Sequence, residues 1–186
     1  MNNSIHPSAI VDTKDIGKNS KIWAFVHILN NVHIGENVNI CDHCFIEQNV
    51  SIGNNVTIKC GVWIWDGVTI EDNVFIGPNV TFTNDIYPRS KNADFEKKQT
   101  ILKMGSSIGA NATLLSGIEI GAYSMVGAGS VVTKNVSNYS MVYGNPATFK
   151  GYICKCGKKL NMVDQINQCT CGLQYKTDQS NNIKLI

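Results

Sequence analysis

An isoleucine recurs at every sixth position through the first half of the chain. From position 10 to position 76 all twelve members of this series are Ile, and the next member is Phe82. A smaller apolar residue, usually Val, stands four places after each Ile from position 26 to position 80. A period of six matches neither the 3.6-residue turn of a helix nor the simple alternation of a strand. Each six-residue unit therefore predicts one short strand followed by one corner.

Three such units can close into one turn of a triangular prism, with the large aliphatic side chain pointing inward. Gly and Asn, which number 16 and 22 in this chain, supply the corner conformations that most residues avoid. We expect about four coils from residues 10–83 and about two more from residues 104–138, stacked at the ~4.8 Å spacing of paired strands. An ordinary sandwich or barrel would not keep one register over thirteen units. The predicted fold is an all-β parallel solenoid.

Composition limits the function classes. The hydrophobic share of 43% is too high for a disordered chain, and no apolar run is long enough to span a membrane. The net charge of +2 argues against a dedicated nucleic-acid binder. The first residues lack a basic start and an apolar stretch, so seven cysteines indicate a reducing compartment rather than a disulfide framework. We expect a cytoplasmic protein with no nucleic-acid partner and no membrane contact.

The six-residue register breaks once, over residues 83–103. Excursions of that length in a compact domain are usually functional or disordered. Positions 18 apart should stack, so one outward column is expected to hold Asn30, Gln48, Asp66 and Asn84, with Glu47, Trp65 and Thr83 beside it. Carboxylate, amide and aromatic groups beneath a long loop suit a polar, ring-shaped ligand. The alternative is a plain ladder of polar side chains that solvates a corner.

Residues 1–150 resemble the hexapeptide-repeat acyltransferases, whose fold is a left-handed parallel β-helix. The handedness follows from this resemblance and not from the period. The motifs around Trp65-Asp66-Gly67-Val68, residues 79–85 and Pro88-Arg89-Ser90 are similar to those of the subgroup that N-acylates nucleotide-linked amino sugars, including 3-amino-3,6-dideoxyhexoses. The resemblance implies a homotrimer with active sites between adjacent prisms. It favours dTDP over UDP as the carrier and C3 as the amine position, and leaves the acyl length open.

The resemblance also implies roles for individual residues. It assigns catalysis to Asn84 and Asp85, where Asn84 would position the sugar amine beside the thioester. An amide has no useful basicity, so that role is one of orientation. The residues expected to hold the substrate lie in the column and the loop, with one histidine beside them: His43, Glu47, Gln48, Trp65, Asp66, Tyr87, Arg89, Ser90 and Lys91.

The last coils are rich in small residues, as is typical of transferases in this family that use acetyl-CoA or another acyl-CoA. Small outward side chains would let a pantetheine arm lie against the backbone, and Lys134 would meet a CoA phosphate. The alternative is that Gly and Ala only form corners. Thr148 stands where the family usually has a basic residue, which weakens that phosphate contact. The predicted cofactor-binding residues are Gly109, Ala110, Gly127, Ala128, Thr133, Lys134, Asn145 and Pro146.

The composition changes after residue 150, so residues 151–186 are expected to form a Cys-rich extension similar to a zinc ribbon. Two Cys-X-Cys-Gly pairs, Cys154/Cys156 and Cys169/Cys171, can supply four thiolates to a structural zinc ion. The usual knuckle has two intervening residues, so a metal-free hairpin that covers the open end of the prism is the alternative. Cys44 falls on the inward register, which predicts packing rather than reactivity.

Two other function classes share the prism. A γ-type carbonic anhydrase needs three converging zinc-binding histidines, whereas His27, His33 and His43 fall on different faces. A non-enzymatic scaffold would need neither the polar column nor the small-residue pattern of the last coils. Members of the superfamily that use a catalytic His differ from this chain, which has none in or after the loop.

Overall fold

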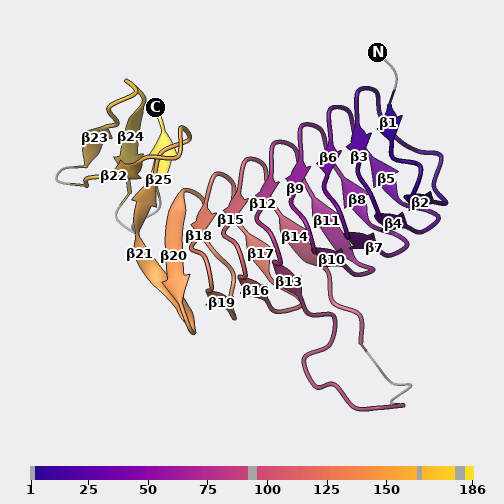
Figure 1. The fold of residues 1–186 in the computed structure, drawn as a ribbon. Coiled ribbons are helices and arrows are strands. Elements are labelled where there is room, and N and C mark those ends of the chain that lie inside the picture. Colours follow the sequence, from indigo (N-terminus) through magenta and orange to yellow (C-terminus); the bar gives the residue numbers. More distant parts are fainter. Residues whose placement is uncertain (1–2, 92–95, 163–164, 179–182) are drawn as a thin grey trace.

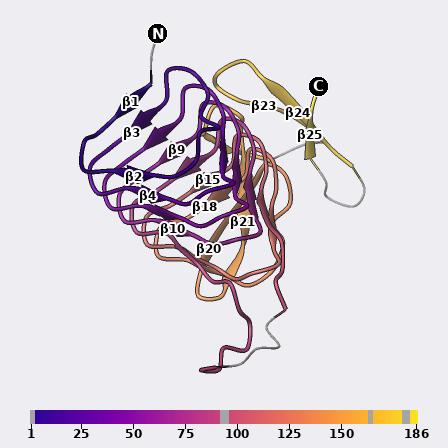
Figure 2. The same cartoon turned by 90° about the vertical axis from the view of Figure 1, so that its right-hand side faces the viewer.

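The computed structural model describes residues 3–91, 96–162, 165–178 and 183–186. Three parallel sheets form the sides of a triangular prism, as predicted, and the chain winds around it as a left-handed parallel β-helix (Figures 1 and 2). Each turn contributes one short strand to each side, and residues 18 positions apart face each other, for example Asn39 with Thr57. None of the described segments forms a helix of the length and apolarity that spanning a bilayer requires.

The strands group into four sheets. Sheet A contains β1 (Ser4–Ile5), β3 (Lys21–Ile22), β6 (Asn39–Ile40), β9 (Thr57–Ile58), β12 (Phe75–Ile76), β15 (Ser107–Ile108), β18 (Met125–Val126), β20 (Ser140–Gly144), β21 (Ala147–Ile153) and β22 (Lys159–Leu160). Sheet B contains β2 (Ile10–Val11), β4 (His27–Ile28), β7 (Phe45–Ile46), β10 (Trp63–Ile64), β13 (Thr81–Phe82), β16 (Thr113–Leu114) and β19 (Val131–Val132). Sheet C contains β5 (His33–Ile34), β8 (Ser51–Ile52), β11 (Val68–Ile70), β14 (Thr100–Leu102) and β17 (Glu119–Ile120). Sheet D contains β23 (Ile166–Gln168), β24 (Gln174–Thr177) and β25 (Ile183–Leu185).

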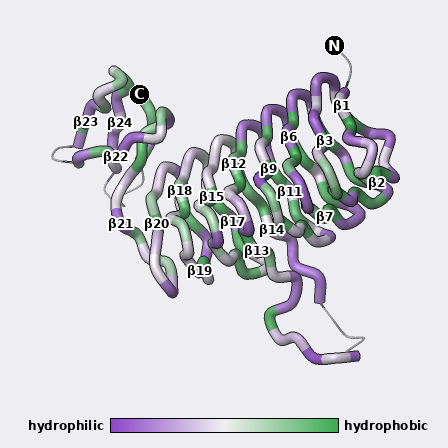
Figure 3. The backbone as a smooth tube through the Cα atoms, viewed as in Figure 1, coloured by the Kyte–Doolittle hydropathy of each residue, from purple (hydrophilic) through white to green (hydrophobic). Residues whose placement is uncertain are grey.

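The six-residue register builds the core. Every Ile of the series from Ile28 to Ile76 is at most 1% exposed, and the smaller residues between them are equally inward. Cys44 is 1% exposed, so its predicted packing role is confirmed. Burial raises the pKa of its thiol to about 12. Figure 3 shows the resulting alternation of hydrophobic and hydrophilic residues along each coil.

The register slips by one residue in the first coil, which the sequence reading missed. Ile10 pairs with His27, and Val11 pairs with Ile28. Ile10 therefore points outward and is 57% exposed, while Val11 packs on the core.

Asparagine makes many of the corners. Asn37, Asn55 and Asn73 all have φ between 56° and 60°, a left-handed conformation that Asn tolerates better than most side chains. The amide of Asn37 donates to Asn55 Oδ1 in the next coil at 3.3 Å. Stacked Asn side chains therefore fix both the corner conformation and the spacing of the coils.

The excursion is shorter than predicted. Strand β14 begins at Thr100, so the loop covers residues 83–99 and not 83–103. Thr69 pairs with Ile101, 32 positions away, which is 14 more than in a regular coil. The difference arises because Thr100 and Leu102, at 3% and 0% exposure, fill the inward positions that Val and Ile fill elsewhere.

The C-terminal end of the prism is covered by an antiparallel hairpin. Strand β20 extends the parallel stack, so the prism has about eight turns and not the six predicted. Strand β21 then turns back along β20, and its Ala147 packs on the core. This strand crosses the expected domain boundary at residues 150/151. Beyond it, β22 and sheet D form the Cys-rich extension, which lies beside the last coils (Figures 1 and 2).

Candidate active site

Several of the candidate residues lie at the corner that follows sheet B, hereafter the B–C corner. Thr81 pairs with Trp63 below it and with Thr113 above it, and Thr113 pairs with Val131. This register places Asp66, Asn84 and Lys134 at the same corner. Two coils separate Asn84 from Lys134, which corresponds to about 10 Å along the prism.

Asp66 anchors the loop at this corner. Lys97 Nζ, at the far end of the loop, lies 3.0 Å from Asp66 Oδ1, and Asn49 Nδ2 donates to Asp66 Oδ2 at 3.1 Å. Burial alone would raise the pKa of the Asp66 carboxyl, but the hydrogen bonds from Lys97 and Asn49 outweigh it and lower the pKa. Glu47 Oε2 accepts from the Asp66 backbone N–H at 2.8 Å. Glu47 and Asp66, two of the three predicted carboxylates, thus make contacts at the base of the loop.

The polar ladder that leads to Asp66 runs through two residues that were not predicted as site residues, Asn31 and Asn49. Asn31 donates to Asn49, and Asn49 donates to Asp66. Gln48 lies one position before this ladder and is exposed. The sequence did offer a signal, because Asn31 and Asn49 occupy the position in the six-residue unit where other corners also have Asn. In the structure these two residues have φ of 55° and 58°.

An aromatic cluster lies beside the loop on the outer face of sheet B. The rings of Phe45, Trp63 and Trp65 have centroids 6.0–6.2 Å apart. Trp65 Nε1 donates to the carbonyl of Phe82 at 2.7 Å, at the residue where β13 ends and the loop begins. Trp63 is 55% exposed and lines a shallow depression of about 190 Å³ together with Trp65 and Thr81. The cluster offers ring faces and edges of the kind that pack against sugars and bases.

Phe45 and Trp63 were not predicted as site residues. Each precedes an inward Ile, so each points outward from the prism. Two bulky aromatics at outward positions 18 residues apart were the signal that the sequence offered.

The front of the loop carries the two predicted catalytic residues. Asn84 is exposed, and Asp85 Oδ1 accepts from the Tyr87 backbone N–H at 2.7 Å, which forms a tight turn. Tyr87 is 81% exposed, and Arg89 donates to the carbonyl of Pro88 at 2.8 Å. Ser90 and Lys91 are also exposed, and the loop projects away from the prism (Figure 1). Apart from Asp85, which is partly exposed, these side chains are open to the solvent in one chain.

His43 lies away from the residues with which it was grouped. It sits at the corner that precedes β7, hereafter the A–B corner, whereas Glu47 follows β7. Its ring stacks on Phe25 with centroids 5.0 Å apart. Within one chain the width of sheet B separates His43 from Asn84, because sequence proximity does not bring residues on successive corners together.

The eight residues predicted to hold the acyl donor divide into three places. Thr133 and Lys134 are exposed at the B–C corner, and Asn145 and Pro146 form the tip of the β20–β21 hairpin. Lys134 and the hairpin residues Ala147 and Phe149 line a second depression of about 190 Å³. The hairpin tip and the loop project on the same side of the prism in both views (Figures 1 and 2).

The remaining four lie at the A–B corner, where packing accounts for the glycines. A Cβ on Gly109 would lie 2.8 Å from Ala128 Cα and nearer still to its backbone nitrogen. A Cβ on Gly127 would lie 2.6 Å from Tyr143 Cβ. Ala110 and Ala128 follow these glycines at the same corner, where Ala110 is partly exposed and Ala128 is exposed. The glycines are therefore required for coil stacking, whatever binds outside them.

The four predicted metal ligands of the extension are brought together. Cys154, Cys156, Cys169 and Cys171 have sulfur atoms that all lie within 4.8 Å of one another. This cluster lies in the C-terminal extension and is separate from the B–C corner. Of the histidines, His27 lies on sheet B and His33 on sheet C, where His33 Nδ1 is 2.8 Å from Asp15 Oδ2.

Comparisons with known proteins agree with this architecture. The family model described as bacterial transferase hexapeptide (six repeats) matches residues 15–48, 49–84 and 100–134. A dTDP-3-amino-3,6-dideoxy-alpha-D-galactopyranose 3-N-acetyltransferase of Aneurinibacillus thermoaerophilus is 60% identical over 172 residues, which are 92% of this chain and 90% of that one.

Solved structures share the fold. A mutant of GDP-perosamine N-acetyltransferase from Caulobacter crescentus, in complex with CoA and GDP-perosamine, superposes with a TM-score of 0.52 at 22% identity. The match covers 81% of this chain and 57% of that one. A hexapeptide-repeat acetyltransferase from Vibrio cholerae gives a TM-score of 0.53 at 27% identity, covering 64% of this chain and 73% of that one.

Proposed function

Because the chain belongs to the bacterial transferase hexapeptide family, we propose that it moves an acetyl group from acetyl-CoA to the amino group of a nucleotide-linked amino sugar. The observation that carries the proposal is the 60% identity, over nearly the whole of both chains, to an N-acetyltransferase of that kind. The chain is accordingly an acyltransferase.

The proposed substrate is a dTDP-linked 3-amino-3,6-dideoxyhexose, acylated at the C3 nitrogen. This choice rests on the similarity to the Aneurinibacillus enzyme, a 3-N-acetyltransferase of a dTDP-3-amino-3,6-dideoxyhexose. The aromatic cluster of Phe45, Trp63 and Trp65 supports a ring-shaped ligand beside the loop. A product of this kind suits surface polysaccharide synthesis, such as that of O-antigen, in the cytoplasm.

The proposed chemistry needs positioning more than a strong base. A sugar amine has a neutral fraction near pH 7, and its nitrogen attacks the thioester carbon to form a tetrahedral oxyanion. The Asn84 carbonyl accepts a hydrogen bond from the amine and aims its lone pair. A backbone N–H from a neighbouring coil stabilises the oxyanion. The oxyanion then collapses, the C–S bond breaks, and the proton given up by the attacking nitrogen passes to the leaving sulfur, so that CoA leaves as the thiol and the sugar carries an amide.

The proposed assembly is a homotrimer with the site between adjacent prisms. Two observations support it: Asn84 and Tyr87 project from the prism, and bulky apolar side chains stay uncovered on its surface. Trp23, Phe25 and Trp63 are 46%, 61% and 55% exposed in one chain. Large exposed apolar side chains of this kind are candidates for burial against a neighbouring prism.

The proposal is tested by thiol release from acetyl-CoA with a panel of dTDP- and UDP-linked amino sugars. We expect Asn84→Ala to lower kcat by roughly 10- to 100-fold, as for the loss of a positioning contact. Asn30→Ala, an exposed Asn at the same corner, is the matched control and should keep wild-type turnover. Normal turnover of Asn84→Ala would contradict the assigned role.

The same panel separates the remaining functions. Preference for UDP-linked sugars would replace the dTDP assignment. Failure of every sugar to release CoA would favour a binding or scaffold protein instead.

A further inference from the structure

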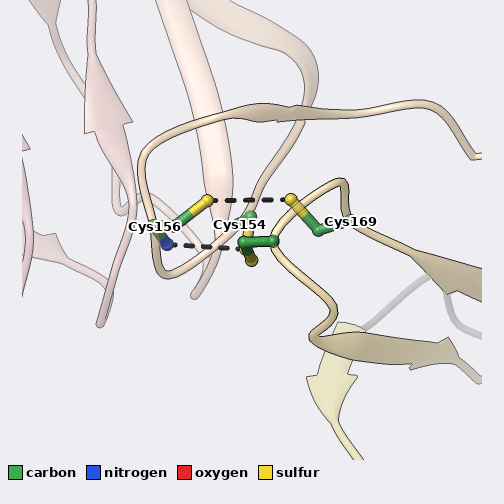
Figure 4. A group of neighbouring side chains, drawn as sticks. Cys154, Cys156 and Cys169 are labelled. Atoms are coloured by element: carbon green, nitrogen blue, oxygen red, sulfur yellow. Dashed lines mark hydrogen bonds between the residues drawn. The ribbon is translucent and has the colours of Figure 1, made fainter.

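The four cysteines of the extension have the geometry of a tetrahedral metal site. Cys154 Sγ lies 3.5 Å from Cys171 Sγ, and Cys156 Sγ lies 3.6 Å from Cys169 Sγ. Four thiolates around Zn²⁺ at ~2.3 Å have sulfur–sulfur distances of about 3.8 Å. A disulfide would need about 2.05 Å, and all four residues are free thiols. Figure 4 shows the side chains of Cys154, Cys156 and Cys169 converging from two separate turns.

The two turns are built in the same way. Cys154 N donates to Lys158 O at 2.8 Å, and Cys169 N donates to Leu173 O at 2.8 Å. In both turns the Gly after the second Cys donates back to the carbonyl of the first Cys, at 2.8 and 2.9 Å. Gly157 and Gly172 have φ of 86° and 95°, which only Gly adopts readily. Two matching turns that face each other present two sulfur atoms each, although only one residue separates the cysteines.

Hydrogen-bond donors surround the sulfur of Cys154. Tyr175 is fully buried, and its hydroxyl donates to Cys154 Sγ at 3.2 Å while it accepts from Lys155 N at 2.8 Å. Cys156 N also donates to Cys154 Sγ, at 3.4 Å. Donors to a ligating sulfur orient it and offset its charge. Four thiolates and Zn²⁺ carry a net charge of −2, and Lys155, Lys158 and Lys159 lie next to the first turn.

The buried core of the extension is small. Among the residues that the structure describes, the buried apolar side chains of this cluster are Cys154, Leu160, Cys169, Tyr175 and Ile183. Two of these five are candidate ligands. A unit of this size rarely supports itself by burial alone and usually depends on a metal or disulfides.

The same centre joins the extension to the prism. The rings of Tyr175 and Tyr139 have centroids 5.4 Å apart, and Tyr139 stacks on Tyr123 of the coil below, also at 5.4 Å. Lys155 lies over the Tyr123 ring, 4.9 Å from its centroid. Tyr175 thus contacts a candidate ligand on one side and the last coils on the other.

We propose that Cys154, Cys156, Cys169 and Cys171 bind one structural Zn²⁺ that fixes the extension against the C-terminal end of the prism. Four protein ligands close the coordination sphere, so the ion has no open position for substrate. Soft thiolates in a tetrahedron exclude Mg²⁺ and Ca²⁺ and leave zinc or iron as the candidates. We assign zinc. The proposal is independent of the transfer reaction, because the extension and the excursion loop lie on opposite sides of the prism (Figure 1).

The test is metal analysis of the full chain, purified under reducing conditions. We expect about one zinc and little iron per chain, loss of the zinc in Cys171→Ser, and retention in Cys60→Ser, an exposed cysteine outside the cluster. Hydrogen exchange should show that a chelator removes protection from β22–β25 and leaves β3–β18 protected.

A second measurement applies if Cys171→Ser does not fold. Wild-type protein stripped of metal and loaded with Co²⁺ should show the intense thiolate-to-cobalt absorption of a tetrahedral site. The proposal is overturned by less than roughly half an equivalent of zinc after reloading. Iron in place of zinc, or a Cys154–Cys171 disulfide in freshly reduced protein, would also overturn it.

Discussion

Replacing Gly109 by Ala tests why this position requires Gly: for the stacking of the coils or for binding of the acyl donor. A Cβ at Gly109 would meet the backbone of Ala128 at 2.8 Å or less, whereas ordinary contact begins at 3.4 Å. Relief requires the two coils to separate by up to ~1 Å at this corner. Two hydrogen bonds flank the clash, from Gly109 N to Val126 O and from Gly129 N to Ala110 O, both at 2.8 Å.

A separation of that size would weaken both bonds beyond useful length. At ~1 kcal/mol each the expected loss is about 2 kcal/mol, which agrees with the usual cost of overpacking. For a chain of this length the loss corresponds to a Tm decrease of roughly 4–8 °C. The measurement is thermal unfolding followed by circular dichroism, together with the KM for acetyl-CoA well below Tm.

Gly129→Asn is the matched control. Gly129 has φ of 68° and open space around its Cβ position, and Asn occupies many other left-handed corners of the prism. We expect a Tm change below about 2 °C in this variant. Unchanged stability of Gly109→Ala, combined with a raised KM for acetyl-CoA, would refute the stacking explanation and favour direct contact with the donor.

Two further predictions concern the loop and the core. Asp66→Asn should remove the attraction to Lys97, worth ~0.5 kcal/mol at this partly exposed pair, and speed hydrogen exchange at residues 96–99 about twofold. The pKa of Asp66 is lowered in the folded chain, so its carboxylate stabilises the loop fully above about pH 5. This stabilisation is lost as the pH falls below about 4 and the carboxylate is protonated, so the wild type should then approach the faster exchange of the variant. Glu96→Gln is the control, and equal protection in wild type and Asp66→Asn would contradict the anchoring role. Buried Cys44, with its thiol pKa raised to about 12, should resist alkylation in the native protein while exposed Cys60 reacts; equal labelling would show that the coils open readily.

The core could be predicted almost residue by residue because one property, inward burial, repeats at one period. The prediction failed where a different residue satisfied the same requirement. Thr100 and Leu102 are buried as deeply as the Val and Ile of other coils, but they do not continue the Ile series, so the loop was predicted four residues too long. Ile10 has the residue type of the series but not its inward position. It pairs with His27 and not with Ile28, because the first coil is one residue shorter than the others.

The candidate site was less predictable, because it depends on contacts between residues far apart in sequence. The register correctly put Asp66 and Asn84 at one corner, but it could not show that Lys97 returns to Asp66. It grouped His43 with Glu47, although the two lie at corners on opposite ends of strand β7. The four cysteines were predicted from spacing, whereas Tyr175 as their hydrogen-bond partner emerged only from the folded extension.

Two coils separate Asn84 from Lys134, so the distance between these two residues along the prism is a whole multiple of the coil spacing. Strand pairing permits only whole coils between the loop and the terminal hairpin, so each regular step adds 18 residues and ~4.8 Å. Inserting or deleting one coil would change the distance between Asn84 and Lys134 by ~4.8 Å, far more than a reacting amine and thioester tolerate. Smaller changes in the distance between the bound sugar and the bound acyl donor must come from side chains and from the excursion loop. The number of coils between Asn84 and Lys134 must stay constant.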